Sequence, residues 1–385
     1  MKHLSAIISW LTFSVCLTLS AQDTQPAADV GIPSRFSQLD RNGDGNLSAA
    51  EAGTAAFFKL ADRDGDGFVT LDEAKAHARR STASEQNRSA GMEGDGAGPM
   101  TSRVNPVNIP EAESPVLELN AKAVDGREVT AFWRKPAGDG PFPAVIFIHG
   151  GLTQFPEGVL RRQLTINPVV TRMLAAGYAV AQATFRSYEE EVESRGPIED
   201  VRAVVHSLAM APGVDAKRVA VFGGSGGGNI ALELGADPAL CAIIAGEPAT
   251  VLYTGMLTTG AYGPRLEIMA KPTEYFTPAL RQRTLEKLKK VRAPVLILHS
   301  DQHELHKLNG PLFVPLMKEA GVKVEYREYP GYGHGFYFGG GDDRWGKGAD
   351  DRVVAEVVRD VCAFLDKSLD VGSIEETGKA IRTKN

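Results

Sequence analysis

The 385-residue sequence predicts an α/β fold: a doubly wound, mostly parallel sheet with helices on both faces, preceded by a small all-α module. Over residues 111–370, apolar strand-like runs alternate with helix-like segments. Several runs, such as 144–148 and 294–299, are continuously apolar, which is typical of strands buried on both faces. A shorter acidic stretch, residues 33–78, has a helical pattern of its own.

The elements of the long region can be placed in order. An antiparallel pair is expected on either side of the turn Asp125-Gly126, and Gly177 and Gly321 are helix stop signals. The expected strands are 116–119, 128–134, 144–148, 178–183, 219–222, 242–245, 294–299 and 322–329. The expected helices are 164–176, 198–211, one beginning at Asn229, 312–320 and 351–369.

The two ends and the linker differ from these units in composition. Lys2 and His3 precede an apolar run over 4–19, and the small residues Ser20 and Ala21 follow, which is typical of a cleaved signal peptide at 1–21. We therefore expect an exported protein, periplasmic or extracellular, without a membrane span in the mature chain. Residues 79–110 form a linker rich in Ser, Gly, Pro and Asn, and 371–385 form a polar tail.

Composition narrows the class of protein. An apolar fraction of 43% fits globular packing, and a net charge of −6 argues against a nucleic-acid partner. The mature chain keeps Cys241 and Cys362. Export would allow a disulfide between them, but two separate buried thiols are favoured.

Two twelve-residue acidic loops, 40–51 and 62–73, lie in the small module. In each loop, positions 1, 3, 5, 7, 9 and 12 match the oxygen donors of an EF-hand, and Gly45 or Gly67 permits the sharp turn at position 6. The sequence therefore predicts an EF-hand pair with Ca²⁺ as its ion. The expected ligands are Asp40, Asn42, Asp44, Asn46, Ser48 and Glu51 in the first loop, and Asp62, Asp64, Asp66, Phe68, Thr70 and Glu73 in the second.

The spacing of the two loops is short, because residues 52–61 must serve both as exit helix and as entry helix. The spacing also resembles that of dockerin repeats, which would imply a scaffold partner. Dockerins usually carry Asp at the last ligand position, whereas this chain has Glu51 and Glu73. We expect the module to have a structural or tethering role and to depend on the metal for its order.

Residues 219–228, Val-Ala-Val-Phe-Gly-Gly-Ser-Gly-Gly-Gly, carry the strongest chemical signal in the long region. An apolar strand runs into Gly-x-Ser-x-Gly centred on Ser225, and a helical pattern follows. This is the arrangement of a nucleophile elbow, in which a strained turn exposes the serine hydroxyl. A serine nucleophile needs a base, and His334 alone among the eight histidines lies in a Gly-rich loop after the last strand.

These residues resemble the α/β-hydrolase superfamily, in particular its prolyl-oligopeptidase and dienelactone-hydrolase-like branches. The resemblance covers roughly residues 111–370 and rests on four segments: His149-Gly150-Gly151, Asp200, the elbow, and Tyr329-Pro330-Gly331 leading to His334-Gly335-Phe336. It implies a serine hydrolase that needs no cofactor for catalysis. It also implies an oxyanion hole from the backbone N–H of Gly226 with that of Gly151 or Leu152.

The chain departs from the family at the acid of the triad. Relatives usually end the preceding strand as His-Gly-x-x-Asp, but here the segment is His299-Ser300-Asp301-Gln302-His303-Glu304, and the usual acid position holds His303. Asp301 is the preferred acid, since a local deletion would bring it into place. Glu304 and Glu247, after the strand before, remain alternatives.

The predicted substrate is a small carboxylic ester, with a peptide as the alternative. Peptide-cleaving relatives usually carry a β-propeller in front of this domain, for which the preceding segment has no room. A second alternative is a calcium-dependent binding module whose hydrolase domain has lost turnover. The aromatic side chains Tyr253, Tyr262, Tyr275 and Phe276 either line an acyl or leaving-group pocket or form a lid core without substrate contact.

Overall fold

The computed structural model describes residues 36–37, 39–48, 51, 61, 66–76, 102, 104–188, 195–257, 267–341 and 346–382, with side chains of the last helix up to 368. The chain divides into two compact units, Met1–Gly96 and Ala97–Asn385. The predicted signal peptide lies outside the described residues, as does most of the predicted linker. No helix among the described residues is both long and apolar enough to cross a membrane.

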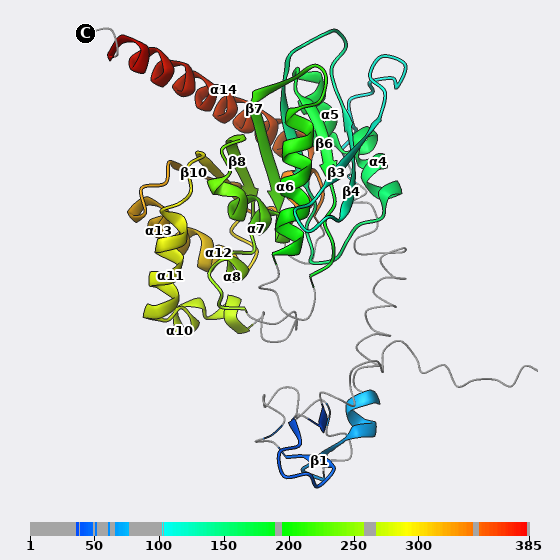
Figure 1. Cartoon of the computed structure of the whole chain (residues 1–385), viewed down its shortest axis with the longest axis vertical. Coiled ribbons are helices and arrows are strands. Elements are labelled where there is room, and N and C mark those ends of the chain that lie inside the picture. The colour runs from blue at the N-terminus through cyan, green and yellow to red at the C-terminus, as the bar shows by residue number, and fades with distance from the viewer. Residues whose placement is uncertain are drawn as a thin grey trace, which may run out of the picture. The chain divides into compact units, whose positions relative to one another are not determined.

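The larger unit is built on an eight-stranded sheet in the order β10-β9-β8-β7-β5-β6-β4-β3 (Figure 1). Strand β3 pairs antiparallel with β4 around Asp125-Gly126, β4 pairs antiparallel with β6, and all other neighbours are parallel. The strands are β3 (Leu117–Lys122), β4 (Glu128–Arg134), β5 (Phe142–Ile148), β6 (Ala179–Ala183), β7 (Val214–Gly224), β8 (Leu240–Gly246), β9 (Val295–His299) and β10 (Val324–Glu328).

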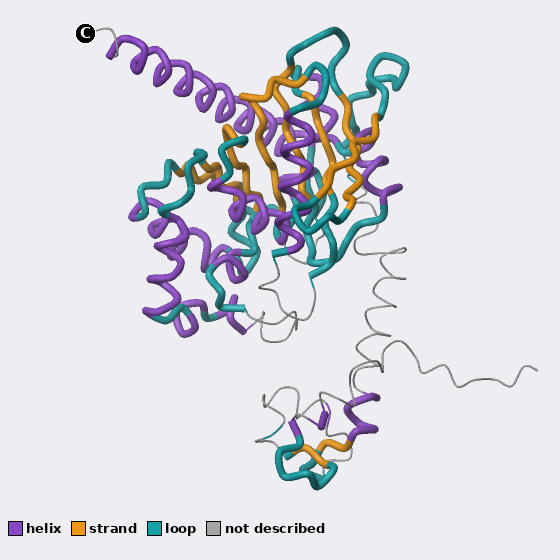
Figure 2. Tube along the Cα trace, viewed as in Figure 1, coloured by secondary structure: helices purple, strands orange, loops and turns teal. Residues whose placement is uncertain are grey.

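Helices cover both faces of the sheet, as the tube in Figure 2 shows. Alternate residues of each central strand point to opposite faces, so Val145 and Phe147 of β5 join one apolar core while Ile146 and Ile148 join the other. The helices are α4 (Glu157–Ile166), α5 (Pro168–Ala175), α6 (Gly196–Ala209), α7 (Gly226–Glu233), α8 (Thr250–Tyr253), α10 (Pro272–Tyr275), α11 (Pro278–Leu288), α12 (His306–Leu308), α13 (Val314–Glu319) and α14 (Asp351–Arg382).

The helices on each face of the sheet pack into a separate apolar core. Side chains of α6, α7, α11 and α13 pack into one core, and those of α4, α5 and α14 pack into the other. Because the central strands are covered on both sides, their continuously apolar sequences are explained. The predicted doubly wound α/β fold is confirmed.

The single helix expected over 164–176 is wrong. Helix α4 ends at Ile166 and α5 begins at Pro168, with Asn167 extended between them. The Asn167 side chain accepts hydrogen bonds from the N–H groups of Val169 and Val170, and Pro168 occupies the first turn, where its missing N–H costs nothing. The dipeptide Asn167-Pro168 is therefore a new helix start inside an uninterrupted amphipathic pattern.

Both ends of the predicted hydrolase region differ from expectation. Val104 is buried in one of the two cores, and the carbonyl of Ile109 accepts a hydrogen bond from the buried Arg134, so residues assigned to the linker pack on the domain. Helix α14 continues to Arg382, past the point where a tail was expected.

Cys241 and Cys362 are both free thiols, and burial raises the pKa of Cys241 to about 12.

The described part of the smaller unit contains a two-stranded antiparallel pair, β1 (Asn46–Leu47) with β2 (Val69–Thr70). Leu47 and Val69 face each other in register and are fully buried. They share a small core with Phe36, Ala61 and Ala74. Residues 52–60, most of the segment expected to serve as the shared helix, lie outside the described residues.

Helix α7 approaches strand β5 so closely that only glycine fits at one position. A Cβ built on Gly227 would lie 2.3 Å from the carbonyl oxygen of His149 and 2.4 Å from that of Ile148. These are backbone atoms on a central strand, so they cannot move aside without displacing the sheet. The glycine at 227 therefore sets how near the helix lies to the strand.

We expect Gly227→Ala to destabilise the larger unit by about 3 kcal/mol, because the new methyl group forces α7 away from β5. Gly158→Ala is the matched control: this glycine lies in α4, and its added Cβ would meet nothing within 4 Å. Alanine in that helix should be neutral or stabilising by up to about 1 kcal/mol. Urea unfolding of both variants measures the difference, and equal midpoints would contradict the close-approach argument.

Candidate active site

Ser225 joins β7 to α7 in a strained backbone conformation, with φ 52° and ψ −114°. For a non-glycine residue this conformation is unfavourable and must be imposed by its surroundings. The Ser225 N–H donates to the carbonyl of Gly246 at 2.8 Å, and the Ser225 carbonyl accepts from Asn229 at 3.1 Å and Ala249 at 2.9 Å. These bonds hold the turn from β8 and from its own helix.

A buried tyrosine packs the histidine loop against this turn. The ring of Tyr337 lies where a side chain on Gly224 or Gly246 would be, since a Cβ at either position would approach the ring to 2.4 or 2.5 Å. The same ring meets the imidazole of His334 edge to face, with centroids 6.0 Å apart. Tyr337 thus fits the loop after β10 onto the ends of β7 and β8.

His334 is paired with Glu247. The Nδ1 atom of His334 lies 2.7 Å from Oε2 of Glu247, a carboxylate that is completely buried. Glu247 directly follows β8 and, like Ser225, has a positive φ, 41°. Strands β7 and β8 are neighbours in the sheet, so the residues after them lie at the same edge.

The preferred acid, Asp301, is not brought to His334. Its exposed carboxylate accepts hydrogen bonds from the Gly331 N–H at 2.7 Å and from the Gln302 amide at 2.9 Å, and it thereby caps the loop between β10 and His334. Glu304 is partly exposed and pairs with Lys307 at 2.6 Å. Of the three carboxylates considered from the sequence, the structure places Glu247 at the imidazole, because the segment after β9 turns its acidic side chains outward.

Three imidazoles surround the Glu247 carboxylate. His334 contacts Oε2, His299 approaches Oε1 to 3.6 Å through Nδ1, and His303 stacks on His334 with ring centroids 4.2 Å apart. Backbone N–H groups of Ser300 and Gly335 donate to the two carboxylate oxygens, each at 3.3 Å. Burial by itself raises the pKa of Glu247, but the charge of His334 and its hydrogen bond act against burial and contribute most to lowering it to about 2.

The loop after β5 is held by His149. Its ring is stacked between Phe155, at 3.9 Å, and Phe185, at 4.3 Å, and its Nδ1 lies 2.8 Å from the carbonyl oxygen of Gly150. Burial lowers the pKa of His149 to about 4, so the ring is neutral above that pH. The two stacking contacts and the Gly150 contact hold the ring, and with it the loop, in place.

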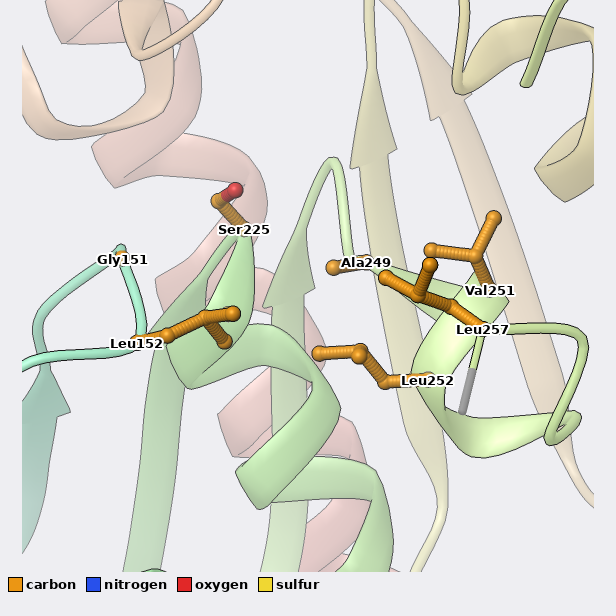
Figure 3. A pocket seen from close by; sticks show the side chains of 8 residues that line it. Gly151, Leu152, Ser225, Ala249, Val251, Leu252 and Leu257 are labelled. Atoms are coloured by element: carbon orange, nitrogen blue, oxygen red, sulfur yellow. The ribbon is translucent and has the colours of Figure 1, made fainter. Parts of the chain in front are cut away.

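That loop and the elbow together form one wall of a pocket beside Ser225 (Figure 3). A Cβ on Gly226 would lie 2.1 Å from the carbonyl oxygen of Gly151, so the two segments are in contact. The side chains of Leu152 and Leu252 point toward each other across the gap. The pocket measures about 250 Å³, including the part open to solvent, and is lined by Gly151, Leu152, Ser225, Gly226, Ala249, Val251, Leu252 and Leu257.

Of the two alternatives for the aromatic side chains, pocket lining or a lid core, the described residues fit the second, since none of them lines the pocket. Tyr253 is buried, and its ring packs edge to face on Phe313 at 5.4 Å and beneath the ammonium group of Lys287. Tyr275 and Phe276 pack on a separate small core. Tyr262 lies outside the described residues. The described pocket lining is aliphatic, and the sequence did not single out Val251, Leu252 or Leu257.

In the smaller unit, the first acidic loop is shaped by its own carboxylates. Asp40 accepts hydrogen bonds from Gly43 at 2.8 Å and Gly45 at 2.9 Å, and Glu51 accepts from the Ser48 hydroxyl at 2.7 Å. The Ser48 hydroxyl and N–H lower the pKa of Glu51. Among the described residues, no three His, Cys, Asp or Glu side chains converge as a metal-binding group. The oxygen donors fit Ca²⁺ in kind, while Asp62 and Asp64 lie outside the described residues.

Two family models match separate parts of the chain. Residues 132–239 match the BD-FAE family model, which is of the α/β-hydrolase type, and residues 34–51 and 54–75 match the EF-hand family model. The resemblance stated from the sequence is confirmed in both parts. No curated protein sequence matches the chain.

Solved structures with a similar fold include esterases. A brefeldin A esterase, described as a bacterial homologue of human hormone-sensitive lipase, has 21% identity and a TM-score of 0.50, with 71% of this chain and 82% of that chain covered. An esterase of the fungus Rhizomucor miehei has 16% identity and a TM-score of 0.50, with 72% and 90% covered. A puromycin hydrolase has 20% identity and a TM-score of 0.50, with 68% and 40% covered. At these identities the likeness shows the fold.

The neutral, buried His149 predicts a specific loss of stability in mild acid. Its pKa is about 4 in the folded chain and near the ordinary 6.5 when unfolded, so the unfolded state binds the extra proton between these values. The neutral His149 ring therefore contributes about 3 kcal/mol to the free energy of unfolding above pH 6.5. This contribution is lost as the pH falls toward 4.

His149→Phe should remove that part of the pH dependence, because a phenyl ring fills the same stack without titrating. Unfolding free energies measured by urea between pH 7 and 4 test this. His206→Asn is the control, because His206 lies half exposed beside Asp237 and its loss should leave the steep acid limb unchanged. An equally steep limb in His149→Phe would refute the assignment.

Proposed function

We propose that this protein is an exported serine hydrolase that cleaves small carboxylic esters, with Ser225 as nucleophile, His334 as base and Glu247 as the orienting acid. The observation that carries the proposal is the pairing of His334 with a completely buried carboxylate at 2.7 Å. The strained Ser225 turn at the same sheet edge supports it. A buried ionised acid on Nδ1 leaves the other imidazole nitrogen available as a base.

In this mechanism the Ser225 hydroxyl oxygen attacks the ester carbonyl carbon, and its proton passes to Nε2 of His334. The carboxylate of Glu247 stabilises the imidazolium that forms. His334 returns the proton to the leaving alkoxide, which departs as the alcohol and leaves an acyl-serine. A water molecule then repeats the sequence and releases the acid.

The oxyanion formed in each attack needs N–H donors. Gly226 begins α7, where N–H groups have no partner within the helix, and Gly151 lies in contact with it at the pocket wall. We assign the N–H groups of Gly226 and Gly151 to the oxyanion. One such donor typically contributes about 10²–10³ in rate.

The pocket favours an ester with a small apolar acyl group over a peptide. Its side-chain lining, apart from Ser225, is aliphatic, and none of the eight lining residues is charged. Such a wall binds a short alkyl chain by apolar contact but offers no counter-charge to a peptide terminus. Short-chain acyl esters are therefore the proposed substrates.

The first test is hydrolysis of p-nitrophenyl acetate and butyrate by the mature protein, with Ser225→Ala measured in parallel. We expect turnover by the wild type and its loss in the variant. Absence of wild-type turnover across several acyl lengths would instead support a ligand-binding module without catalysis.

The same assay separates the candidate acids. We expect Glu247→Gln to lower kcat by about 10³–10⁴, because an amide no longer holds the imidazole in the required tautomer and no longer stabilises its charge. Asp301→Asn should stay within about threefold of wild type, since its exposed carboxylate only caps a loop. The reverse order of effects would return the role to Asp301.

We also propose that the EF-hand pair binds Ca²⁺ and serves as a structural or tethering module. The two matched segments, 34–51 and 54–75, support this, as do the oxygen donors of the first loop. The first 21 residues, with their basic start and apolar run, support export. Calcium at the concentrations found outside the cytoplasm would then keep the small core ordered.

Chelation of calcium should unfold the small unit and leave ester hydrolysis mostly intact, because the proposed triad lies wholly in the larger unit. Protease sensitivity within 33–78 and p-nitrophenyl butyrate turnover, both measured with and without EGTA, check the two parts. Glu51→Gln with Glu73→Gln is the matched variant without chelator. Loss of most activity on chelation, restored by added Ca²⁺, would contradict independence of the two units.

A further inference from the structure

We propose that Asn309 and His299 are positioning residues for Glu247: Asn309 fixes the tautomer of His299, and His299 fixes the loop whose N–H holds the buried carboxylate. The proposal rests on the proposed hydrolase function, because it concerns how the triad acid is kept in place. Neither Asn309 nor His299 belongs to the triad itself. Asn309 makes its first contact one residue after Glu247, at the carbonyl of Pro248.

The orientation of the Asn309 amide is determined by that carbonyl. Nδ2 of Asn309 lies 3.0 Å from the Pro248 carbonyl oxygen, which only accepts hydrogen bonds, so the atom facing it must be the NH₂ group. On the other side, the Asn309 oxygen accepts from the hydroxyl of Thr250. Exchanging the two amide atoms would set oxygen against oxygen at Pro248, so the assignment is unambiguous.

The same NH₂ group determines the tautomer of His299. Nδ2 of Asn309 also lies 2.9 Å from Nε2 of His299, and since the amide donates, that ring nitrogen must accept. A ring that accepts at Nε2 is neutral and carries its proton on Nδ1. Complete burial lowers the pKa of His299, which agrees with a neutral ring.

The Nδ1–H of His299 then acts on the loop that holds Glu247. It donates to the Ser300 carbonyl at 2.7 Å, with Oε1 of Glu247 at 3.6 Å on the same side. The N–H of Ser300 donates to that same Oε1 at 3.3 Å. His299 therefore fixes the turn after β9, whose Ser300 N–H binds the Glu247 carboxylate. Its own Nδ1–H is a second N–H dipole on the same side of that carboxylate.

The backbone at Glu247 gives Asn309 a further role. Glu247 has φ 41°, an unfavourable conformation for a non-glycine residue, and the bond from Asn309 holds the adjacent carbonyl. Asn309 itself opens a π-helical turn, Asn309–Phe313. Such turns are rare and recur at functional sites, where they redirect a side chain. Here the redirected side chain is a fully buried amide with every polar atom engaged.

The test is Asn309→Asp, a change of nearly equal shape that replaces the donor with an acceptor. The carboxylate at 309 cannot donate, so the Pro248 carbonyl beside Glu247 loses its donor and His299 must carry a proton on Nε2. We expect kcat on p-nitrophenyl butyrate to fall about tenfold or more, with KM within about twofold. The acid limb of the kcat/KM profile should move to lower pH, because a misplaced Glu247 supports the imidazolium less.

A second pair of variants covers the case in which Asn309→Asp fails to fold. In His299→Asn the amide nitrogen takes the place of Nδ1, so activity should stay within about threefold and the profile should keep its midpoint. His299→Leu removes the donor and should lower kcat about tenfold with the same shift. Tyr178→Phe is the control for simple destabilisation, since it removes a buried bond to Asp366 far from this site and should leave the pH profile unchanged.

The tautomer can be read directly, without any assay of activity. Long-range ¹H–¹⁵N spectra of the full chain should show His299 protonated at Nδ1 between pH 7 and 8 and altered in Asn309→Asp. A wild-type ring protonated at Nε2, or a wild-type pH profile in folded Asn309→Asp, would overturn the proposal. If wild type shows no Ser225-dependent turnover, the proposed function fails, while the spectra still decide the tautomer.

Discussion

A completely buried carboxylate, Glu247, is the constraint on which the rest of the site depends. Removing an ionised carboxylate from water costs several kcal/mol unless donors replace the water. Here three donors come from two loops: the Ser300 N–H after β9, and the Gly335 N–H and His334 ring after β10. These segments therefore cannot shift independently, and the carboxylate couples the loop that carries His334 to the central strands.

The order of the parallel strands brings these segments to one edge of the sheet. Strands β7, β8, β9 and β10 are neighbours and run in the same direction, so their carboxyl ends meet at one edge. Ser225 follows β7, Glu247 follows β8, His299 ends β9, and His334 lies in the loop after β10. The strain found at Ser225 and Glu247, the two non-glycine residues with positive φ among those described, is concentrated at this edge. The covered sheet behind them supplies the packing that maintains it.

The sequence predicted the fold, and it singled out Ser225 and His334 as candidates, because each of these inferences depends on local patterns. Continuous apolar strands and the glycines around Ser225 are signals within about ten residues. The carboxylate that contacts His334 was not predictable in this way, because its identity depends on which of two neighbouring loops turns inward. Counting from His299 placed position 303 where relatives carry their acid, and the structure does put residue 303 against His334. The position was correct, but it holds a stacked imidazole instead of a carboxylate.

That replacement agrees with a carboxylate partner of His334 that lies one strand earlier, at Glu247. A loop that presents His303 to the face of His334 has no carboxylate there to bind Nδ1, so the partner of Nδ1 must come from β8. Nδ1 of His303 accepts the Leu305 N–H at 3.2 Å, which holds the ring as a neutral base in its own loop. A neutral ring at 4.2 Å can remain beside His334 when that residue becomes positively charged, whereas a second imidazolium would oppose the charge. His299 and the segment after it therefore contribute buried imidazoles, and Glu247 is the buried carboxylate that His299 and His334 approach.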